Sequence, residues 1–372
     1  MTDMHPRVVA FGGFLAAGKT TSLLALARRL KADGKSVGIV TNDQAGRLVD
    51  TEIFRASGFN AAEVAGGCFC CRFDDFIARA DELIERVNPA VILAEPVGSC
   101  TDIVGTVLNP LKQLYPGRFT IAPYVVLVDP LRALKVLGRT GPVSLSERVT
   151  YIYRMQQQEA DAIAIAKVDL LSPQDRDRVE ALVREQFPGR RVLSFSALTG
   201  EGLDELVAYL ATNSGGGKAL ENLDYDIYAA GEAELGWLNC SVRLQSPGVR
   251  DVDAVLTELG SGILEGCRQR NLEIAHGKLL IKSDGQVAVL NMTDTAAEPV
   301  LSRTSGASAA EMNLTINLRI QASPGELDKI VQIALSHWAN QSGGTVTAKA
   351  AQAFSPPRPV PTHRIPESSA QV

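Results

Sequence analysis

The sequence lacks the features of several large protein classes. It has no apolar run long enough to cross a membrane, so we expect no membrane partner. Its net charge of −5 gives no sign of the basic surface that nucleic-acid binding requires, so nucleic acid is not expected as a partner either. Only four histidines occur and no tract is rich in them, which argues against a role in storing metal.

Cysteine is scarce too, and it is unevenly distributed. Three of the six cysteines fall within residues 68–71, a crowding that suits thiol or metal chemistry better than a disulfide framework. No secretory signal is expected, because a glycine-rich motif already begins at residue 13. We therefore predict a protein of the reducing cytoplasm, and its 372 residues are enough for two domains.

A complete GxxxxGK[ST] motif is present at residues 13–20. It lies between a short apolar run, 8–11, and a run of helix formers, 22–30, which is the context in which backbone N–H groups cradle phosphates. Lys19 would bridge the terminal phosphates of a nucleoside triphosphate, as a catalytic residue, and Thr20 would bind Mg²⁺. The alternative is a plain glycine-rich turn. The predicted cradle consists of Gly13, Ala16, Ala17, Gly18, Lys19, Thr20 and Thr21.

Residues 1–212 alternate strand-like and helix-like segments. This alternation predicts an α/β fold, a P-loop domain with a mainly parallel sheet, whose ligands bind beyond the carboxyl ends of the strands. The expected strands are 8–11, 36–41, 90–94, 120–128, 162–166 and 191–195, and helical stretches include 75–87 and 173–186.

The character of the sequence changes after a glycine-rich linker at 213–219. Two similar halves follow, with strands at 235–244 and 312–320, each leading into a Pro-Gly turn and a helix. Together they predict a smaller α+β, ferredoxin-like domain at 220–354. The proline-rich segment 355–372 predicts a disordered tail.

Two further segments are candidates for the magnesium side of a nucleotide site. Glu95 ends a buried strand and could orient the attacking water or hold the water shell of Mg²⁺, and Gly98 could offer its N–H to the γ-phosphate. Asp43, which follows the second strand, could also approach Mg²⁺, as could Asp129 after a later strand. The alternatives are a glutamate at a strand end for Glu95, and a turn or helix N-cap for the two aspartates.

Guanine is the predicted base. Lys167 and Asp169 form a degraded NKxD motif, in which the carboxylate would accept from N1–H and N2–H₂ of guanine and the lysine stem would cover the ring. Ser196 and Ala197 begin an SAxxG segment whose backbone N–H would bind O6 of the base. Ala166 replaces the usual asparagine, which removes one bracing hydrogen bond, but the order of the two segments favours GTP over ATP.

Cys68, Cys70 and Cys71 follow a Gly-Gly turn, in the interval where nucleotide-sensing switch segments fall in such folds. Thiolates at this spacing can direct two or three sulfurs at one soft ion such as Zn²⁺, Co²⁺ or Ni²⁺. Simple burial and a redox pair are the alternatives. Cys100 could be an extra ligand, although a buried thiol is the favoured interpretation. The remaining cysteines, expected in the core of the second domain, are Cys240 and Cys267.

In this order, the phosphate loop, GGCxCC, ExxG and KxD segments resemble the CobW-like family of metallochaperone GTPases, relatives of the GTPases that load nickel into hydrogenase and urease. The resemblance implies a metal site at Cys68, Cys70 and Cys71, slow GTP hydrolysis, and delivery of the metal to a client metalloenzyme. Ala16-Ala17 and Pro96-Val97 depart from the usual Gly-Ser and Thr-Ser, which suggests a divergent branch with an unusual client.

The predicted function is therefore a GTP-driven metallochaperone that uses GTP, Mg²⁺ and a transition metal. GTP would order the segments around Asp43 and Gly98 and thereby pull the cysteine loop into ligand geometry. Two other classes stay open: a nucleotide-gated activator of a corrinoid or other cofactor enzyme, with structural thiols, and a small-molecule kinase or ligase. A homodimer stays open as well.

Overall fold

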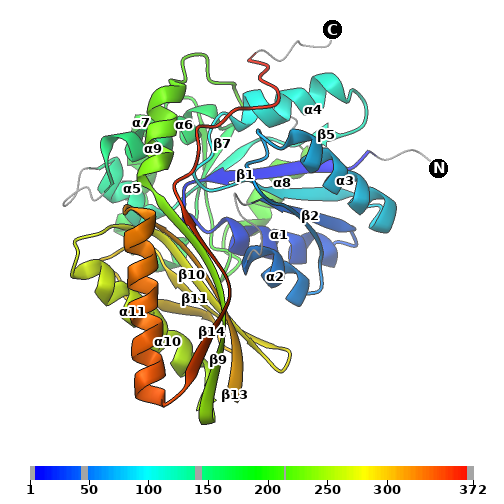
Figure 1. Cartoon of the computed structure of the whole chain (residues 1–372). Helices are drawn as coiled ribbons and strands as arrows, with labels where there is room; N and C mark the ends of the chain where they lie inside the picture. The colour runs from blue at the N-terminus through cyan, green and yellow to red at the C-terminus, as the bar shows by residue number, and fades with distance from the viewer. Residues whose placement is uncertain (1–4, 43–48, 139–144, 213–214, 367–372) are drawn as a thin grey trace. The chain divides into compact units, whose positions relative to one another are not determined.

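The computed structural model describes residues 5–42, 49–138, 145–212 and 215–366. Contacts divide the chain into two compact units (Figure 1): unit 1 is Met1–Tyr228 with Pro359–Val372, and unit 2 is Ala229–Arg358. In the described part of the chain, no helix combines the length and the apolar character needed to span a membrane.

Unit 1 is built on a sheet with strand order β3-β2-β4-β1-β6-β7-β8, and β5 pairs with β1 outside this path. Every strand pair recorded in this sheet is parallel, as the alternation of short apolar strands with helices predicts. The strands are β1 (Arg7–Gly13), β2 (Val37–Asn42), β3 (Asn60–Val64), β4 (Val91–Glu95), β5 (Thr120–Ile121), β6 (Val125–Val128), β7 (Ala162–Ile165) and β8 (Arg191–Ser194).

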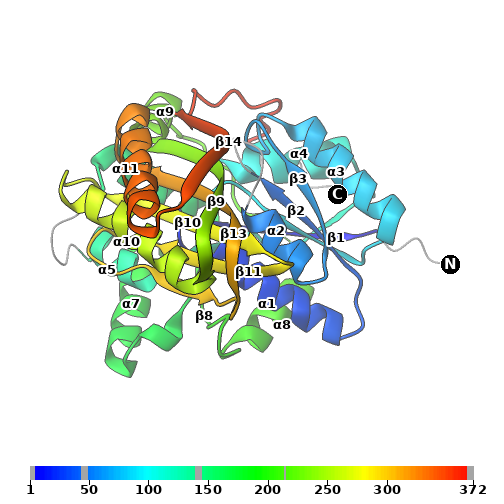
Figure 2. The same cartoon turned by 60° about the horizontal axis from the view of Figure 1, so that its bottom comes forward.

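Helices cover both faces of this sheet. Figures 1 and 2 show α1 and α8 on one side of β1 and β2, and α3 and α4 on the other. The apolar residues of α1 recur at the spacing of one helix face, and Leu23, Leu26 and Leu30 are buried there against the sheet. The helices are α1 (Lys19–Ala32), α2 (Val49–Ala56), α3 (Phe73–Val87), the π-helical η1 (Val104–Leu108), α4 (Asn109–Leu114), α5 (Pro130–Val136), α6 (Glu147–Glu159), the 3₁₀ turn η2 (Val168–Leu170), α7 (Pro173–Gln186) and α8 (Leu203–Thr212); α9 (Tyr225–Glu234) runs across the division between the units.

Two elements differ from the expected strands. The segment 120–128 forms two short strands, β5 and β6, that pair with different parts of β1. Strand β3, at 60–64, is not among the expected strands because its sequence, Asn-Ala-Ala-Glu-Val, has little β propensity; it forms by parallel pairing along β2.

Unit 2 contains an antiparallel sheet with strand order β12-β11-β10-β13-β9-β14. The subset β14-β9-β13-β10, joined through α10 and α11, has the ferredoxin-like split βαβ arrangement that the two similar halves predict. Its elements are β9 (Gly236–Asp251), α10 (Val252–Arg268), β10 (Ile274–Ser283), β11 (Gln286–Met292), β12 (Val300–Arg303), β13 (Ser308–Ile320), α11 (Pro324–Ser342) and β14 (Thr345–Phe354).

The core of unit 2 lies between its sheet and the helices α10 and α11. Cys240 and Cys267 are buried in that core, which confirms the expectation for these two thiols. The predicted Pro-Gly turn before each helix is found in only one of the two halves. Pro324 begins α11 as expected, but Pro247 and Gly248 lie inside β9, and Asp251 caps α10.

The segments near the domain boundaries make specific contacts with unit 1. In the glycine-rich segment, the N–H groups of Gly216 and Gly217 donate to Asp161 Oδ2 at 2.9 and 2.6 Å; residues 213 and 214 lie outside the described part. At the C-terminal end, residues 359–366, which we call the C-terminal strap, lie against unit 1 through hydrogen bonds at Thr362 and Ile365. This differs from the disordered tail that composition predicts, because tertiary contacts hold the segment.

Candidate functional site

The phosphate loop connects the end of β1 to the start of α1. Gly13, Ala16 and Gly18 all have φ between 63° and 129°, so the loop turns three times through the left-handed region. A Cβ at Gly13 would lie 2.6 Å from the carbonyl oxygen of Leu127, which explains the glycine at this position. The turn brings Lys19 and Thr20 to the first turn of α1, where both side chains are buried.

Lys19 folds back over its own loop. Its Nζ donates to the carbonyl oxygens of Gly13, at 2.7 Å, and of Phe14, at 3.3 Å. A Cβ on Gly98 would come within 2.9 Å of the same ammonium, so the backbone at Gly98 lies directly beside it. The structure therefore brings the predicted phosphate-binding lysine and the predicted γ-phosphate sensor together, and their roles in nucleotide binding remain predictions.

Thr20 connects the loop to two carboxylates. Its Oγ1 lies 2.8 Å from Glu95 Oε1 and 2.8 Å from Asp50 Oδ1. A hydroxyl and two carboxylates form the hard oxygen donor set that suits Mg²⁺. Asp50, in the first turn of α2, has no signal in the sequence, since only the fold brings it to Thr20. The other predicted Mg²⁺ residue, Asp43, lies outside the described residues.

The carboxylate of Asp129 contacts Arg132 and Lys167. It accepts from the backbone N–H of Arg132 and so caps α5, and its Oδ2 lies 2.8 Å from Lys167 Nζ. Burial alone would raise the pKa of Asp129, but the Lys167 ammonium and these hydrogen bonds hold it below its ordinary value. The helix-cap alternative is therefore observed, and an approach of Asp129 to Mg²⁺ stays a prediction.

The two segments predicted to bind the base follow neighbouring parallel strands, β7 and β8. Lys167, with φ of 56°, donates from Nζ to the carbonyl oxygen of Ala16 at 2.9 Å, so its stem runs toward the phosphate loop. Asp169 is exposed. Ser196 is buried, and its Oγ accepts from the N–H groups of Leu198 and Thr199, which shapes the turn that contains Ala197. Selection of guanine by this pair of loops remains a prediction.

The cysteine cluster is compact. The Sγ atoms are 2.8 Å apart for Cys68 and Cys70, 3.2 Å for Cys68 and Cys71, and 3.7 Å for Cys70 and Cys71. Cys68 and Cys70 are buried and Cys71 is half-buried. Among the described residues, this is the one group of His, Cys, Asp and Glu side chains whose geometry suits a metal ion. None of the six cysteines forms a disulfide.

Asn42, the last residue of β2, fastens the cysteine loop to the sheet. Its Oδ1 accepts from the N–H of Phe69 at 2.7 Å, and its Nδ2 donates to the carbonyl oxygens of Gly67 at 2.7 Å and Val64 at 3.0 Å. The side chain is buried. Asn42 directly precedes Asp43, so one position joins the cysteine loop to the predicted magnesium side of the site.

The surroundings lower the pKa of one of these thiols and raise the pKa of the other two. Hydrogen bonds from Cys100, Cys70 and Cys71 hold the pKa of Cys68 well below its ordinary value, although burial opposes this. The contacts of Cys70 with Cys100 and Cys68, together with burial, raise the pKa of Cys70 well above its ordinary value. The Cys68 contact raises the pKa of Cys71 to about 11. Of these three thiols, Cys68 is therefore the one whose thiolate the surroundings favour. Binding of a metal ion would favour the thiolate form of all three.

A buried glutamine, which no sequence motif identifies, links two more parts of the site. Gln156, on α6, donates from Nε2 to the carbonyl oxygens of Gly98 at 2.9 Å and of Cys100 at 2.8 Å. It lies one residue before the run 157–161, which is part of the resemblance. A glutamine inside a helix has no pattern of its own, so only the packing identifies it.

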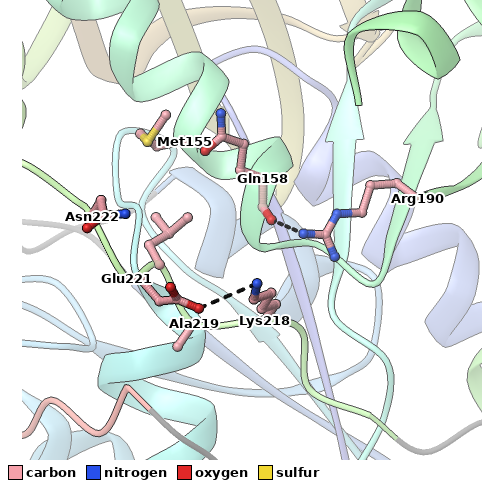
Figure 3. A pocket seen from close by; sticks show the side chains of 8 residues that line it. Met155, Gln158, Arg190, Lys218, Ala219, Glu221 and Asn222 are labelled. Carbon is pink, nitrogen blue, oxygen red and sulfur yellow. Dashed lines mark hydrogen bonds and ion pairs between the residues drawn. The ribbon is translucent and has the colours of Figure 1, made fainter. Parts of the chain in front are cut away.

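A separate surface cavity lies elsewhere on unit 1. It has a volume of about 340 Å³ and includes Met155, Arg190 and Lys218 in its lining (Figure 3). Both cations are engaged, since Arg190 donates to the carbonyl oxygen of Gln158 and Lys218 lies 3.5 Å from Glu221. None of the predicted site residues lines this cavity.

The chain is similar to a known family and to several solved structures. The family model described as CobW/HypB/UreG, nucleotide-binding domain, matches residues 7–194. Among solved structures, HypB from Archaeoglobus fulgidus is 19% identical, with a TM-score of 0.38, over 56% of this chain and 89% of that one.

Two further structures are similar to this chain at the same low level. HypB from Helicobacter pylori in complex with nickel is 19% identical, with a TM-score of 0.40, over 57% of this chain and 93% of its own. Zn(II)-bound YjiA GTPase from E. coli is 13% identical, with a TM-score of 0.35, over 90% of this chain and 99% of its own. The assignment of the chain to a family therefore rests on the family model, which covers half of the chain.

Proposed function

From the premise that this chain belongs to the CobW/HypB/UreG family and is a P-loop GTPase, we propose that it is a metallochaperone. It binds GTP, hydrolyses it slowly, carries a transition metal on Cys68, Cys70 and Cys71, and delivers that metal to a client metalloenzyme in the cytoplasm. The observation that carries this proposal is the contact among the three sulfurs, on a loop fastened by Asn42 to the end of β2.

The nucleotide side of the proposal assigns each group a task. Lys19 binds the β- and γ-phosphates, Thr20, Glu95 and Asp50 supply oxygen ligands suited to Mg²⁺, and Asp43 is a further candidate. Bound Mg²⁺ would neutralise charge that develops on the phosphates. Glu95 also lies where a carboxylate could orient the attacking water. The segment at Gly98, beside the Lys19 ammonium, senses the γ-phosphate.

The donor atoms of the cysteine cluster indicate which kind of metal ion it would bind. Three thiolates suit a soft or borderline cation, Zn²⁺, Co²⁺ or Ni²⁺, and this cation is cargo rather than a resident cofactor. Because β2 ends at Asn42 and Asp43 follows, ordering of that segment by the nucleotide would change how the Asn42 side chain holds the cysteine loop. A coupling of about 1–3 kcal/mol would change metal affinity roughly 5- to 150-fold.

The proposal is tested by titrating Zn²⁺, Co²⁺ and Ni²⁺ into the chain loaded with GDP or with a non-hydrolysable GTP analogue. We expect tighter metal binding in the GTP state. Joint replacement of Cys68, Cys70 and Cys71 by serine should abolish tight binding and leave nucleotide binding mostly intact. Cys240→Ala, at a buried thiol in unit 2, is the matched control and should change neither. Equal metal affinity in the two nucleotide states would contradict the coupling.

Two cheaper measurements separate the other classes. If the thiols are only structural and the chain activates a corrinoid or other cofactor enzyme, elemental analysis will find no transition metal that depends on the three cysteines. A small-molecule kinase or ligase would prefer ATP, whereas Asp169 and the turn at Ser196 lead us to expect preference for GTP. Capture of interacting proteins in the GTP-locked state would identify the client.

A further inference from the structure

The C-terminal strap contacts the cysteine loop through its backbone. The N–H of Thr362 donates to the carbonyl oxygen of Cys70 at 2.8 Å, and the Thr362 hydroxyl donates to that of Cys71 at 3.2 Å. The ring of His363 packs perpendicular to the ring of Phe73, with centroids 5.2 Å apart. Because Phe73 begins α3, the strap contacts both the loop that contains two predicted metal ligands and the start of the helix that follows it.

The second half of the strap is anchored to a different segment of unit 1. Arg364 Nε lies 2.7 Å from Oδ2 of the fully buried Asp102 carboxylate. The N–H of Ile365 donates to the carbonyl oxygen of Gly105 at 2.7 Å, and the Ile365 carbonyl oxygen accepts from Asn109 Nδ2 at 2.8 Å. This segment follows the predicted γ-phosphate sensor in the sequence, so the strap joins it to the cysteine loop.

The strap is held mostly by polar contacts. Val360 is 72% exposed, the Thr362 side chain is exposed, and His363 is only partly buried. Segments with few buried apolar contacts open at a free-energy cost well below that of global unfolding. Pro361 and Pro366 flank the four contact residues and restrict the detached chain, which lowers the entropy lost when the strap attaches again. These properties suit a segment that attaches reversibly.

We infer that the strap is a latch on the cysteine cluster, and that metal leaves the cluster only after the strap detaches. This inference rests on the proposed function. Transfer of a metal ion requires an open coordination position for a ligand of the recipient. The contacts of Thr362 restrain the backbone of two of the three predicted ligands, and detachment of the strap frees it. The contact between Arg364 and Asp102 determines how often the strap detaches.

The test measures how fast Zn²⁺ passes from the full chain, bound to the GTP analogue, to an excess of a chromogenic chelator. Arg364→Ala should raise this rate roughly tenfold or more, the factor expected for loss of a hydrogen bond to a charged group. Thr362→Val, which removes one neutral hydrogen bond, should raise it by a smaller factor. Arg118→Ala is the matched control, because it removes the ion pair with Asp81, which includes no strap residue, and it should leave the rate unchanged.

Hydrogen exchange at the strap shows whether a variant detaches it. Arg364→Ala should remove the protection of the Thr362 and Ile365 amides, which both donate hydrogen bonds in the attached strap. Asp102→Asn combined with Arg364→Ala removes the buried charge together with its partner. Transfer should be as fast in this double variant as in Arg364→Ala, which would exclude an unpaired buried carboxylate as the cause.

The outcomes separate this inference from the proposed function. Loss of protection at the strap without faster transfer would overturn the latch, and so would protection that persists in both Arg364 variants. Equal acceleration in Arg118→Ala would also overturn it, since general loss of stability would then explain the rates. Failure of the wild-type chain to bind Zn²⁺ through Cys68, Cys70 and Cys71 would overturn the proposed function itself, and this is detected at loading, before any transfer is measured.

Discussion

At the scale of single residues, Asn42 connects the cysteine loop to the end of β2. Its amide makes three hydrogen bonds to the cysteine loop and to β3, and its backbone leads directly into the segment at Asp43. An asparagine at a strand end is common in sequences, so its importance comes only from where the fold places Gly67 and Phe69.

Asn42→Ala should weaken the coupling between nucleotide and metal. The change leaves buried backbone groups unsatisfied, so we expect a loss of about 1–3 kcal/mol in the free energy of unfolding. The ratio of Zn²⁺ affinities in the GTP and GDP states should fall toward one. Asn317→Ala, at a buried asparagine in unit 2, is the control and should leave this ratio unchanged. A ratio unaffected by Asn42→Ala would show that the loop is coupled through other contacts.

Glu159 should make the stability of unit 1 depend on pH. Burial, and then the nearby charge of Asp102, raise the pKa of Glu159 well above its ordinary value, although the N–H of Val104 and the hydroxyl of Thr101 oppose the shift. A carboxyl group with a raised pKa in the folded state stabilises the fold at low pH. That contribution is lost as the pH rises from the unfolded value through the folded one.

The free energy of unfolding of the wild-type chain should therefore fall as the pH rises over this interval, by up to about 1.4 kcal/mol per pH unit for this one proton. Glu159→Gln removes the titrating group and should flatten that slope. Urea denaturation of both chains at several pH values above the ordinary carboxyl pKa measures the difference. Parallel slopes in the two chains would contradict the assignment to Glu159.

Residues with a sequence motif were easier to predict than residues that support them. The glycines and Lys19 of the phosphate loop, and the crowded cysteines, have spacings that follow from local chemistry. The residues that support them are different. Asp50 contacts Thr20, Asn42 contacts Gly67 and Gln156 contacts Gly98 only because strands and helices far apart in sequence meet at one edge of a sheet. No local pattern could have identified them.

At the scale of elements, the strands and helices with strong periodicity were predicted well. Helix α7 has the bounds that the sequence predicts, because Ser172 caps it and Pro173 occupies its first position. Strand β3 and the C-terminal strap were not predicted, since both depend on contacts with distant partners. For the strap these include the Thr362 N–H, which donates to Cys70 O at 2.8 Å, and the Ile365 N–H, which donates to Gly105 O at 2.7 Å.

The strap is anchored by an ion pair at a buried carboxylate. Arg364 Nε lies 2.7 Å from Asp102 Oδ2, and the Tyr225 hydroxyl donates to the same oxygen. The Asp102 side chain is fully buried, whereas that of Arg364 is about one-third exposed. Arg364 Nη2 also donates to the carbonyl oxygen of Leu220. The strap therefore ends over the segment that follows Gly98 and passes Cys70 and Cys71 on the way.

Arg364→Ala should destabilise unit 1, because it leaves the Asp102 carboxylate buried without its cation. Removing one partner of a fully buried pair costs about 3–5 kcal/mol, and the partial exposure of Arg364 lowers our expectation to about 1–3 kcal/mol. Arg364→Lys should recover part of the loss, and Asp102→Asn combined with Arg364→Ala should be less destabilised than Arg364→Ala alone. Urea denaturation measures all four chains. A change below about 0.5 kcal/mol in Arg364→Ala would mean that the strap is held by its other contacts.

At the scale of the whole molecule, the two units have separate cores and separate chemistry. The phosphate loop, the loops predicted to bind the base, the three clustered cysteines and the strap all belong to unit 1, whereas unit 2 contains a sheet packed against α10 and α11. Both architectures were predictable from the order of strands and helices. The role of unit 2 in binding a client was not, because a fold does not specify a function.

Nucleotide and metal bound to the same unit must affect each other equally. If the GTP analogue tightens Zn²⁺ binding by a given factor, Zn²⁺ must tighten analogue binding by the same factor, which we expect to lie between about 5 and 150. The check is to measure all four affinities, each ligand with and without saturating amounts of the other.

Lys19→Ala is the control, since loss of its charged contacts with phosphate should weaken nucleotide binding roughly 10- to 150-fold while metal affinity without nucleotide is retained. Because thiols must lose their protons to bind metal as thiolates, Zn²⁺ affinity should fall as the solution is acidified, with or without nucleotide. Two unequal factors would show that the measured metal is not at the cysteine cluster alone, and a factor of one in both directions would remove the nucleotide dependence on which delivery of the metal is proposed to rely.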